Sequence, residues 1–78
     1  MTEQLILGID PGLKNTGWGV INSFKNKESY LSHGVIKTSS KDNLGQRLFS
    51  IFSGVTKLTQ EYKPSFISVE KIFSNINP

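Results

Sequence analysis

The 78-residue chain contains no cysteine and a single histidine, His33. Without cysteine it can form neither a disulfide nor a thiolate metal site, and it has no cysteine nucleophile. One histidine cannot supply a histidine metal cluster. Any metal site in this sequence must therefore use oxygen ligands.

Long apolar runs are also absent. The longest, residues 5–9, is far too short to cross a bilayer, and residues 1–4 lack the basic start and apolar core of a secretory signal. We therefore expect a cytoplasmic protein with no membrane partner. Hydrophobic residues make up 36% of the chain and charged residues 19%, which favours a globular domain over a disordered tract.

The charge balance gives only a weak indication of a partner. Nine Lys and Arg residues against six Asp and Glu residues leave a net charge of +3. This excess is compatible with a polyanion such as nucleic acid. Because the lysines are scattered and form no basic run, charge alone favours DNA binding only slightly.

The order of apolar and polar residues predicts the arrangement β-β-β-α-β. The continuous apolar run 5–9 predicts a central strand, and the runs 17–21 and 30–36 predict an antiparallel hairpin separated by the polar stretch 25–28. From residue 44, apolar residues recur at helical spacing as far as residue 62, followed by a strand over 66–70. Asp42 is the predicted N-cap of the helix, and Lys63-Pro64 its stop.

Two acidic residues end strands of this predicted sheet. A strand that follows a crossover helix normally runs parallel to one already in the sheet, so Asp10 and Glu70 should close neighbouring parallel strands about 4.8 Å apart. Carboxylates that converge in this way suit a hard divalent cation such as Mg²⁺. The alternative is structural: Asp10 would simply start a turn with Pro11-Gly12.

The segment 8–20 joins the first two strands through a glycine-bearing loop. Gly12, Gly17 and Gly19 leave room for a phosphate to approach the backbone. Lys14 and Thr16 offer a cation and a hydroxyl donor, which makes both candidate DNA contacts. The alternative is a tight hairpin that needs glycine and binds nothing. The spacing of a P-loop is absent, and no helix is predicted directly after the loop.

The segments 8–12, 16–20 and 67–73 together resemble the N-terminal half of RuvC-type Holliday junction resolvases, in order and at matching separation. The resemblance implies an α/β fold, an RNase H-like mixed sheet. It also implies a homodimeric endonuclease that nicks opposed strands of four-way DNA junctions in recombination and repair. Cleavage would be two-metal phosphodiester hydrolysis with Mg²⁺, or Mn²⁺ in its place, and a branch-migration helicase complex would be a further partner.

The same resemblance assigns roles to individual residues. Asp10 matches the first catalytic aspartate and Glu70 the catalytic glutamate, both ligands of the metal ions. Phe73 matches an aromatic residue that enters the junction and stacks on a base, a role suited to an aromatic close to a metal ligand. Without the resemblance, Phe73 would be read as a core residue.

Members of this family continue beyond the region that matches residues 1–78 and add two acidic ligands. We therefore expect residues 1–78 to be the N-terminal part of a single RNase H-like nuclease domain, inactive alone and prone to self-association. Two alternatives stay open: an actin-like or sugar-kinase-like ATPase lobe, which shares the Gly-Ile-Asp-x-Gly loop, and a non-catalytic RNase H-like module that binds nucleic acid without cutting.

Overall fold

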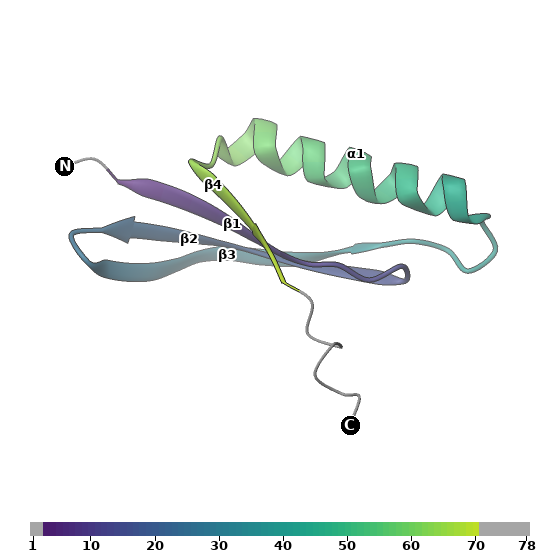
Figure 1. The fold of residues 1–78 in the computed structure, drawn as a ribbon, viewed down its shortest axis with the longest axis horizontal. Helices are drawn as coiled ribbons and strands as arrows, with labels where there is room; N and C mark the ends of the chain where they lie inside the picture. Colours follow the sequence, from purple (N-terminus) through teal and green to yellow (C-terminus); the bar gives the residue numbers. More distant parts are fainter. Residues whose placement is uncertain (1–2, 71–78) are drawn as a thin grey trace, which may run out of the picture.

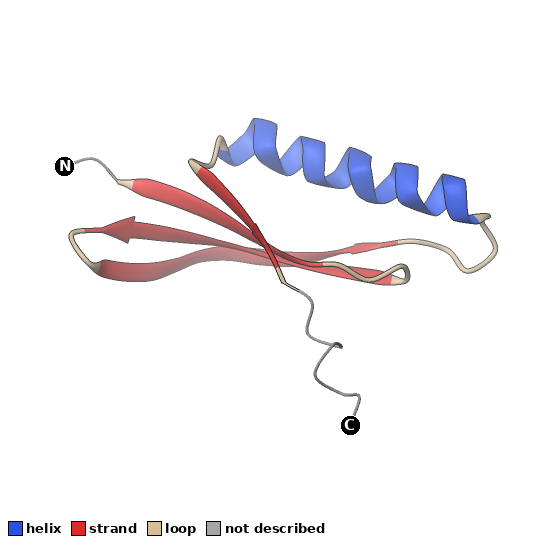
Figure 2. Cartoon of the chain, in the orientation of Figure 1, coloured by secondary structure: helices blue, strands red, loops and turns tan. Residues whose placement is uncertain are grey.

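The computed structural model describes residues 3–70, which form one mixed sheet with a helix on one of its faces (Figure 1). The predicted order β-β-β-α-β is confirmed (Figure 2). The four strands lie in the order β3-β2-β1-β4. The elements are β1 (Gln4–Asp10), β2 (Asn15–Phe24), β3 (Lys27–Lys37), α1 (Leu44–Tyr62) and β4 (Phe66–Val69).

Strand β1 lies inside the described sheet, as its apolar run predicts. It pairs antiparallel with β2 along its whole length and parallel with β4 over residues 6–9. Leu7 is opposite Val20 on one side and Ile67 on the other. The predicted parallel neighbour of the first strand is thus confirmed, and β4 forms one edge of the described sheet.

The hairpin of β2 and β3 is longer than the sequence indicates. Its turn consists of Lys25 and Asn26 alone, with φ angles of 51° and 66°, so the strands extend to Phe24 and Lys27. Two consecutive residues with positive φ are typical of the turn whose twist matches that of the flanking strands. The predicted separation over 25–28 was therefore too wide.

The helix α1 begins one residue later than the predicted cap implies. Asn43, not Asp42, is the N-cap: its side chain accepts a hydrogen bond from the Gln46 backbone at 2.8 Å, and the Gln46 side chain accepts one from the Asn43 backbone at 3.0 Å. This reciprocal pair satisfies two backbone donors at once. The helix ends at Tyr62, and its C-cap Lys63 adopts the left-handed conformation with φ 48°, just before Pro64 as predicted.

The core lies between α1 and the sheet. Leu7 and Val20 are fully buried, Ile9 and Leu58 nearly so, and Trp18 and Tyr62 pack against them with ring centroids 6.1 Å apart. Space for the indole ring depends on a glycine opposite it on β3. A Cβ on Gly34 would lie 2.7 Å from the Trp18 ring, closer than van der Waals contact allows.

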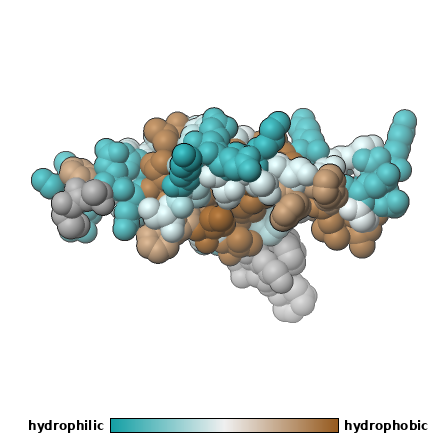
Figure 3. All heavy atoms as spheres, turned by 90° about the horizontal axis from the view of Figure 1, so that it is seen from above, coloured by the Kyte–Doolittle hydropathy of each residue, from teal (hydrophilic) through white to brown (hydrophobic). Residues whose placement is uncertain are grey.

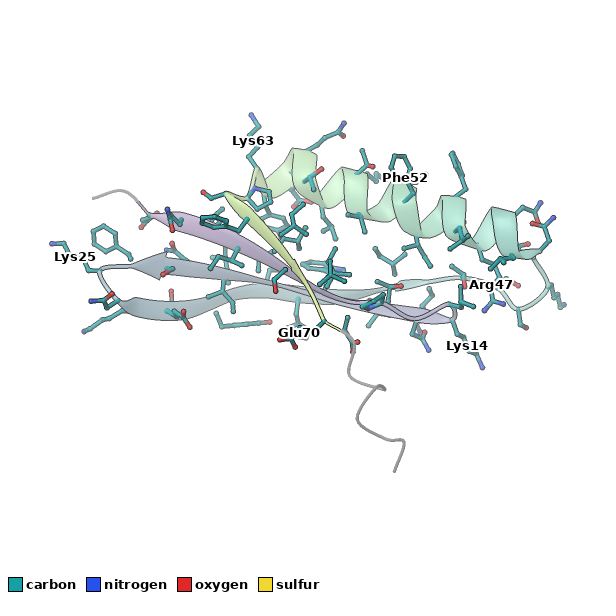
Figure 4. All side chains as sticks on the ribbon, viewed as in Figure 1. Lys14, Lys25, Arg47, Phe52, Lys63 and Glu70 are labelled. Atoms are coloured by element: carbon teal, nitrogen blue, oxygen red, sulfur yellow. The ribbon has the colours of Figure 1, made fainter. Side chains whose placement is uncertain are left out.

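Much apolar surface stays exposed in the described region. Apolar surface interrupts the polar surface in the view from above (Figure 3), and Phe52 of α1 points away from the sheet (Figure 4). Phe49 and Phe52 are 68% and 66% exposed, and every residue of β4 is exposed. Within residues 3–70, the single helix is too polar to span a membrane.

Candidate metal and nucleic-acid site

The candidate site lies where β1 and β4 end side by side. The backbone N–H of Glu70 donates to the Ile9 carbonyl at 3.0 Å, which continues the β1–β4 ladder by one residue and puts Glu70 beside Asp10. Both side chains are exposed and line the same depression. The structure therefore brings together the two acids that the sequence paired (Figure 4 labels Glu70 at the end of β4).

Strand alternation explains why both acids share one face. Leu7 and Ile9 point into the core under α1, so Ile6, Gly8 and Asp10 point to the opposite face. The same alternation along β4 takes Ser68 and Glu70 to that face, next to Gly8 and Asp10. The acids are thus held by backbone pairing in the sheet and lie on the side that α1 leaves open.

The depression beside the acids has a floor without side chains. Gly8 pairs with Gly19, and Asp10 pairs with Gly17, so three glycines adjoin one another on the face away from α1. A Cβ built on Gly17 would contact the Cβ of Asp10 at 3.9 Å. The resulting open hollow has a volume of about 580 Å³. Thirteen residues line it, among them Ile6, Ile21, Tyr30 and Ser68 in addition to the acids and the glycines.

The donor chemistry of this site fits a divalent cation. Asp10 and Glu70 offer carboxylate oxygens at an exposed sheet end, and Mg²⁺ is commonly held by one or two carboxylates together with substrate phosphates. No cluster of three or more His, Cys, Asp or Glu side chains occurs within residues 3–70. The two acids can therefore form part of a metal site whose remaining ligands come from elsewhere.

The loop between β1 and β2 needs its glycine for its own shape. A Cβ on Gly12 would lie 2.5 Å from the Asn15 carbonyl oxygen, so the tight turn excludes any larger residue. Lys14 is exposed at the tip of this loop (Figure 4), where an anion can reach its ammonium group. Its contact with DNA stays a prediction.

Thr16 has a structural position that the sequence analysis did not foresee. It is fully buried, and its hydroxyl donates to the Gly12 carbonyl at 2.8 Å and accepts from the Gly12 N–H at 3.4 Å. It alternates with Gly17, so it points to the side of the sheet that carries α1, away from Asp10. This placement favours a role in closing the loop over direct contact with DNA.

Two residues near the loop were missed by the sequence analysis, and one predicted residue cannot be placed. Thr38 donates hydrogen bonds to the Leu13 and Lys14 backbone, and Arg47 of α1 donates one to the Thr38 hydroxyl. Together they connect the loop to α1. No local motif marks them, because the contact joins residues 25 positions apart.

Phe73, the predicted stacking residue, lies outside the described residues.

Comparison with known proteins shows the family. The model of the family described as "Crossover junction endodeoxyribonuclease RuvC" matches residues 6–78. The RuvC of Herminiimonas arsenicoxydans is 51% identical over 73 residues, and that of Dechloromonas aromatica is 41% identical over 78. These matches cover 94% and 100% of this chain but 40% and 44% of the relatives, so the chain spans less than half their length.

Solved structures agree with the sequence relatives. A Thermus thermophilus RuvC in complex with a Holliday junction substrate superposes with a TM-score of 0.77 at 29% identity, over 87% of this chain and 42% of that one. An Aquifex aeolicus PPX-GPPA enzyme superposes with a TM-score of 0.69 at 14% identity, over 87% and 26%. The second likeness concerns the fold alone, since one fold can carry different activities.

These comparisons confirm the RNase H-like mixed sheet and the resemblance that the motifs indicate. They also count against the ATPase-lobe alternative, because the family match covers 73 residues of this chain, from the middle of β1 onward. The chain belongs to the RuvC family of crossover junction endodeoxyribonucleases.

Proposed function

We propose that this chain forms the N-terminal part of a Holliday junction resolvase, a homodimeric endonuclease that nicks opposed strands of four-way DNA junctions in recombination and repair. The observation that carries the proposal is the convergence of Asp10 and Glu70 on one exposed sheet end, in a chain of the RuvC family. The Thermus thermophilus relative that superposes on this chain is described in complex with a Holliday junction substrate.

Asp10 and Glu70 are the proposed catalytic residues and would hold divalent metal, with Mg²⁺ preferred and Mn²⁺ accepted. The metal ions would supply activation of water and stabilisation of the leaving oxygen in phosphodiester hydrolysis. The backbone pairing of β1 with β4 supports this role, because it holds the backbones of the two residues side by side before DNA arrives. The glycine floor keeps side chains away from the approaching strand.

Two further residues are proposed to bind DNA. Lys14 would neutralise a backbone phosphate near the cleaved bond, since its ammonium group is exposed on the loop that follows Asp10. Phe73 would stack on a base near the centre of the junction. We also propose a cytoplasmic location, where the DNA substrate lies, and cooperation with a branch-migration helicase complex, as the family resemblance implies.

The test uses a completed protein, defined as residues 1–78 of this chain joined to the remaining part of the Herminiimonas arsenicoxydans relative. Asp10→Asn should lower the rate of junction cleavage at least about 100-fold, the order expected when one electrostatic contact to the transition state is lost. Junction binding in Ca²⁺ should be retained, because it depends mainly on cationic residues. The readout is single-turnover cleavage of a labelled four-way junction.

Asp42→Asn is the matched control, since Asp42 is an exposed acid in the loop before α1. It removes the same charge and should leave the cleavage rate within about twofold, as expected for a surface substitution. Full cleavage by the Asp10→Asn protein would overturn the assignment of the site. Loss of cleavage in both variants would show that net charge, not the position of Asp10, is responsible.

A further inference from the structure

Three hydrogen bonds tie the loop after Asp10 to the start of α1. The Thr38 N–H donates to the Lys14 carbonyl at 3.1 Å, and the Thr38 hydroxyl donates to the Leu13 carbonyl. The Arg47 Nε–H donates to the same hydroxyl at 3.3 Å. The hydroxyl of Thr38 thus accepts from one partner and donates to another, which fixes its proton in one direction.

The loop is held by hydrogen bonds on two sides, to Thr16 on the buried side and to Thr38 on the side that faces the start of α1. Inside, the buried Thr16 hydroxyl bonds both backbone groups of Gly12. Outside, Thr38 binds the next two carbonyl groups, those of Leu13 and Lys14. Figure 4 shows Lys14 and Arg47 at the same end of the molecule, where the loop and the N-terminal part of α1 meet.

The position of the loop affects the two candidate site residues next to it, Asp10 before the loop and Lys14 within it. Asp10 is the last residue of β1, only three residues before Leu13, and Lys14 is the residue whose carbonyl Thr38 holds. A shift of the loop would therefore move the attachment point of the ammonium group and change the direction in which the backbone leaves Asp10, whose own place in the sheet is held by pairing with Gly17. Groups that hydrogen-bond a metal-binding side chain tune its affinity for the metal, and Thr38 would act one step further away, through the backbone of the loop.

We propose that Thr38 and Arg47 are positioning residues that set the orientation of Asp10 and Lys14 by clamping the loop between them. This inference rests on the proposed function of the site. Neither residue contacts the reacting atoms in this scheme. Arg47 anchors the Thr38 hydroxyl from α1, and the hydroxyl in turn holds the loop through the Leu13 carbonyl.

The first test replaces the hydroxyl alone. Thr38→Val keeps the shape and the backbone N–H but removes the link between Arg47 and Leu13. In the completed protein it should raise the Mn²⁺ concentration that gives half-maximal cleavage, or lower the cleavage rate at saturating Mn²⁺, by about 10- to 100-fold. Thr38→Ser keeps the hydroxyl and should restore both values to within about threefold.

Thr59→Val is the matched control within the same chain. The Thr59 hydroxyl also donates to a backbone carbonyl, that of Thr56 at 2.7 Å, but it does so within α1, about three helical turns beyond Arg47. The control removes the same chemical group and should leave the dependence on Mn²⁺ unchanged. Circular dichroism and thermal melting of each variant report whether the fold is retained.

A second variant approaches the clamp from the helix. Arg47→Met keeps an unbranched apolar stem and removes Nε, so it should change the dependence on Mn²⁺ in the same direction as Thr38→Val. If both act through one network, the double variant should be no worse than the poorer single variant. Additive losses would show that the two residues act separately and would overturn the proposal.

The outcomes separate this inference from the proposed function. If Asp10→Asn abolishes cleavage while Thr38→Val and Arg47→Met lower only the melting temperature, the site stands and the clamp has a structural role alone. If Asp10→Asn leaves cleavage intact, the proposed function itself fails. An increased requirement for Mn²⁺ in Thr38→Val, restored in Thr38→Ser and absent in Thr59→Val, is the result that the proposal expects.

Discussion

Removal of the Thr16 hydroxyl distinguishes a structural role for this residue from a direct contact with DNA. Thr16 is fully buried, and its hydroxyl donates one hydrogen bond to the Gly12 carbonyl and accepts one from the Gly12 N–H. Thr16→Val retains the volume but leaves the Gly12 carbonyl without this partner. The loss of a partner by a buried polar group costs about 1–3 kcal/mol. Since Gly12 is partly exposed, we expect the lower half of that range.

The assay is thermal unfolding of the completed protein, together with titration of a fluorescent junction in Ca²⁺. The relative's length is about 180 residues, because 73 residues are 40% of it, so each 1 kcal/mol should lower the melting temperature by about 2–4 °C. Junction affinity should stay the same in folded protein. Thr16→Ser, which retains the hydroxyl, should keep the same affinity.

A different result would refute this reasoning. If Thr16→Val melts at the temperature of the unsubstituted protein and loses junction affinity, while Thr16→Ser binds normally, the hydroxyl contacts DNA and the sequence-based prediction holds. The loop would then open when DNA binds, because the described conformation buries the hydroxyl on the side of α1.

Two further predictions concern the fold. Gly34→Ala places a methyl group about 2.7 Å from the Trp18 ring and should displace the indole from Tyr62. We expect this to destabilise the chain by about 1–3 kcal/mol and to alter its near-ultraviolet circular dichroism. An unchanged spectrum and melting temperature would contradict the packing. The 78-residue chain should self-associate through the exposed β4 edge, and Ile67→Lys should reduce the sedimentation coefficient toward that of a monomer. A monomeric unsubstituted chain would contradict the second prediction.

Much of the fold could be predicted because its signals are local. The continuous apolar run of β1 indicates a strand inside the sheet, and the crossover helix makes β4 parallel to an earlier strand. The helix stop at Lys63-Pro64 follows from the missing N–H of proline. The N-cap was wrong by one residue because Asp42 and Asn43 are both good caps, and the choice depends on Gln46 three residues later.

Only part of the candidate site could be predicted from the sequence. Asp10 and Glu70 could be paired from the sequence because strand direction and register alone bring them together. The burial of Thr16 could not be predicted, since a threonine in a glycine-bearing loop can point to either side. The contact of Thr38 with the loop depends on the path of the chain between β3 and α1, which no residue pattern specifies.

The two faces of the sheet differ in a way that connects fold to function. On the α1 side, large side chains such as Leu7 and Val20 fill the space between the layers. On the other side, Gly8, Gly17 and Gly19 expose bare backbone next to Asp10, and a sheet gains no packing energy from glycine. Glycine in a strand interior is costly unless something approaches the backbone closely. Three adjoining glycines beside two convergent acids therefore leave this face open to the close approach of another group, and the proposed DNA strand has the phosphate chemistry that a metal site built from Asp10 and Glu70 would bind.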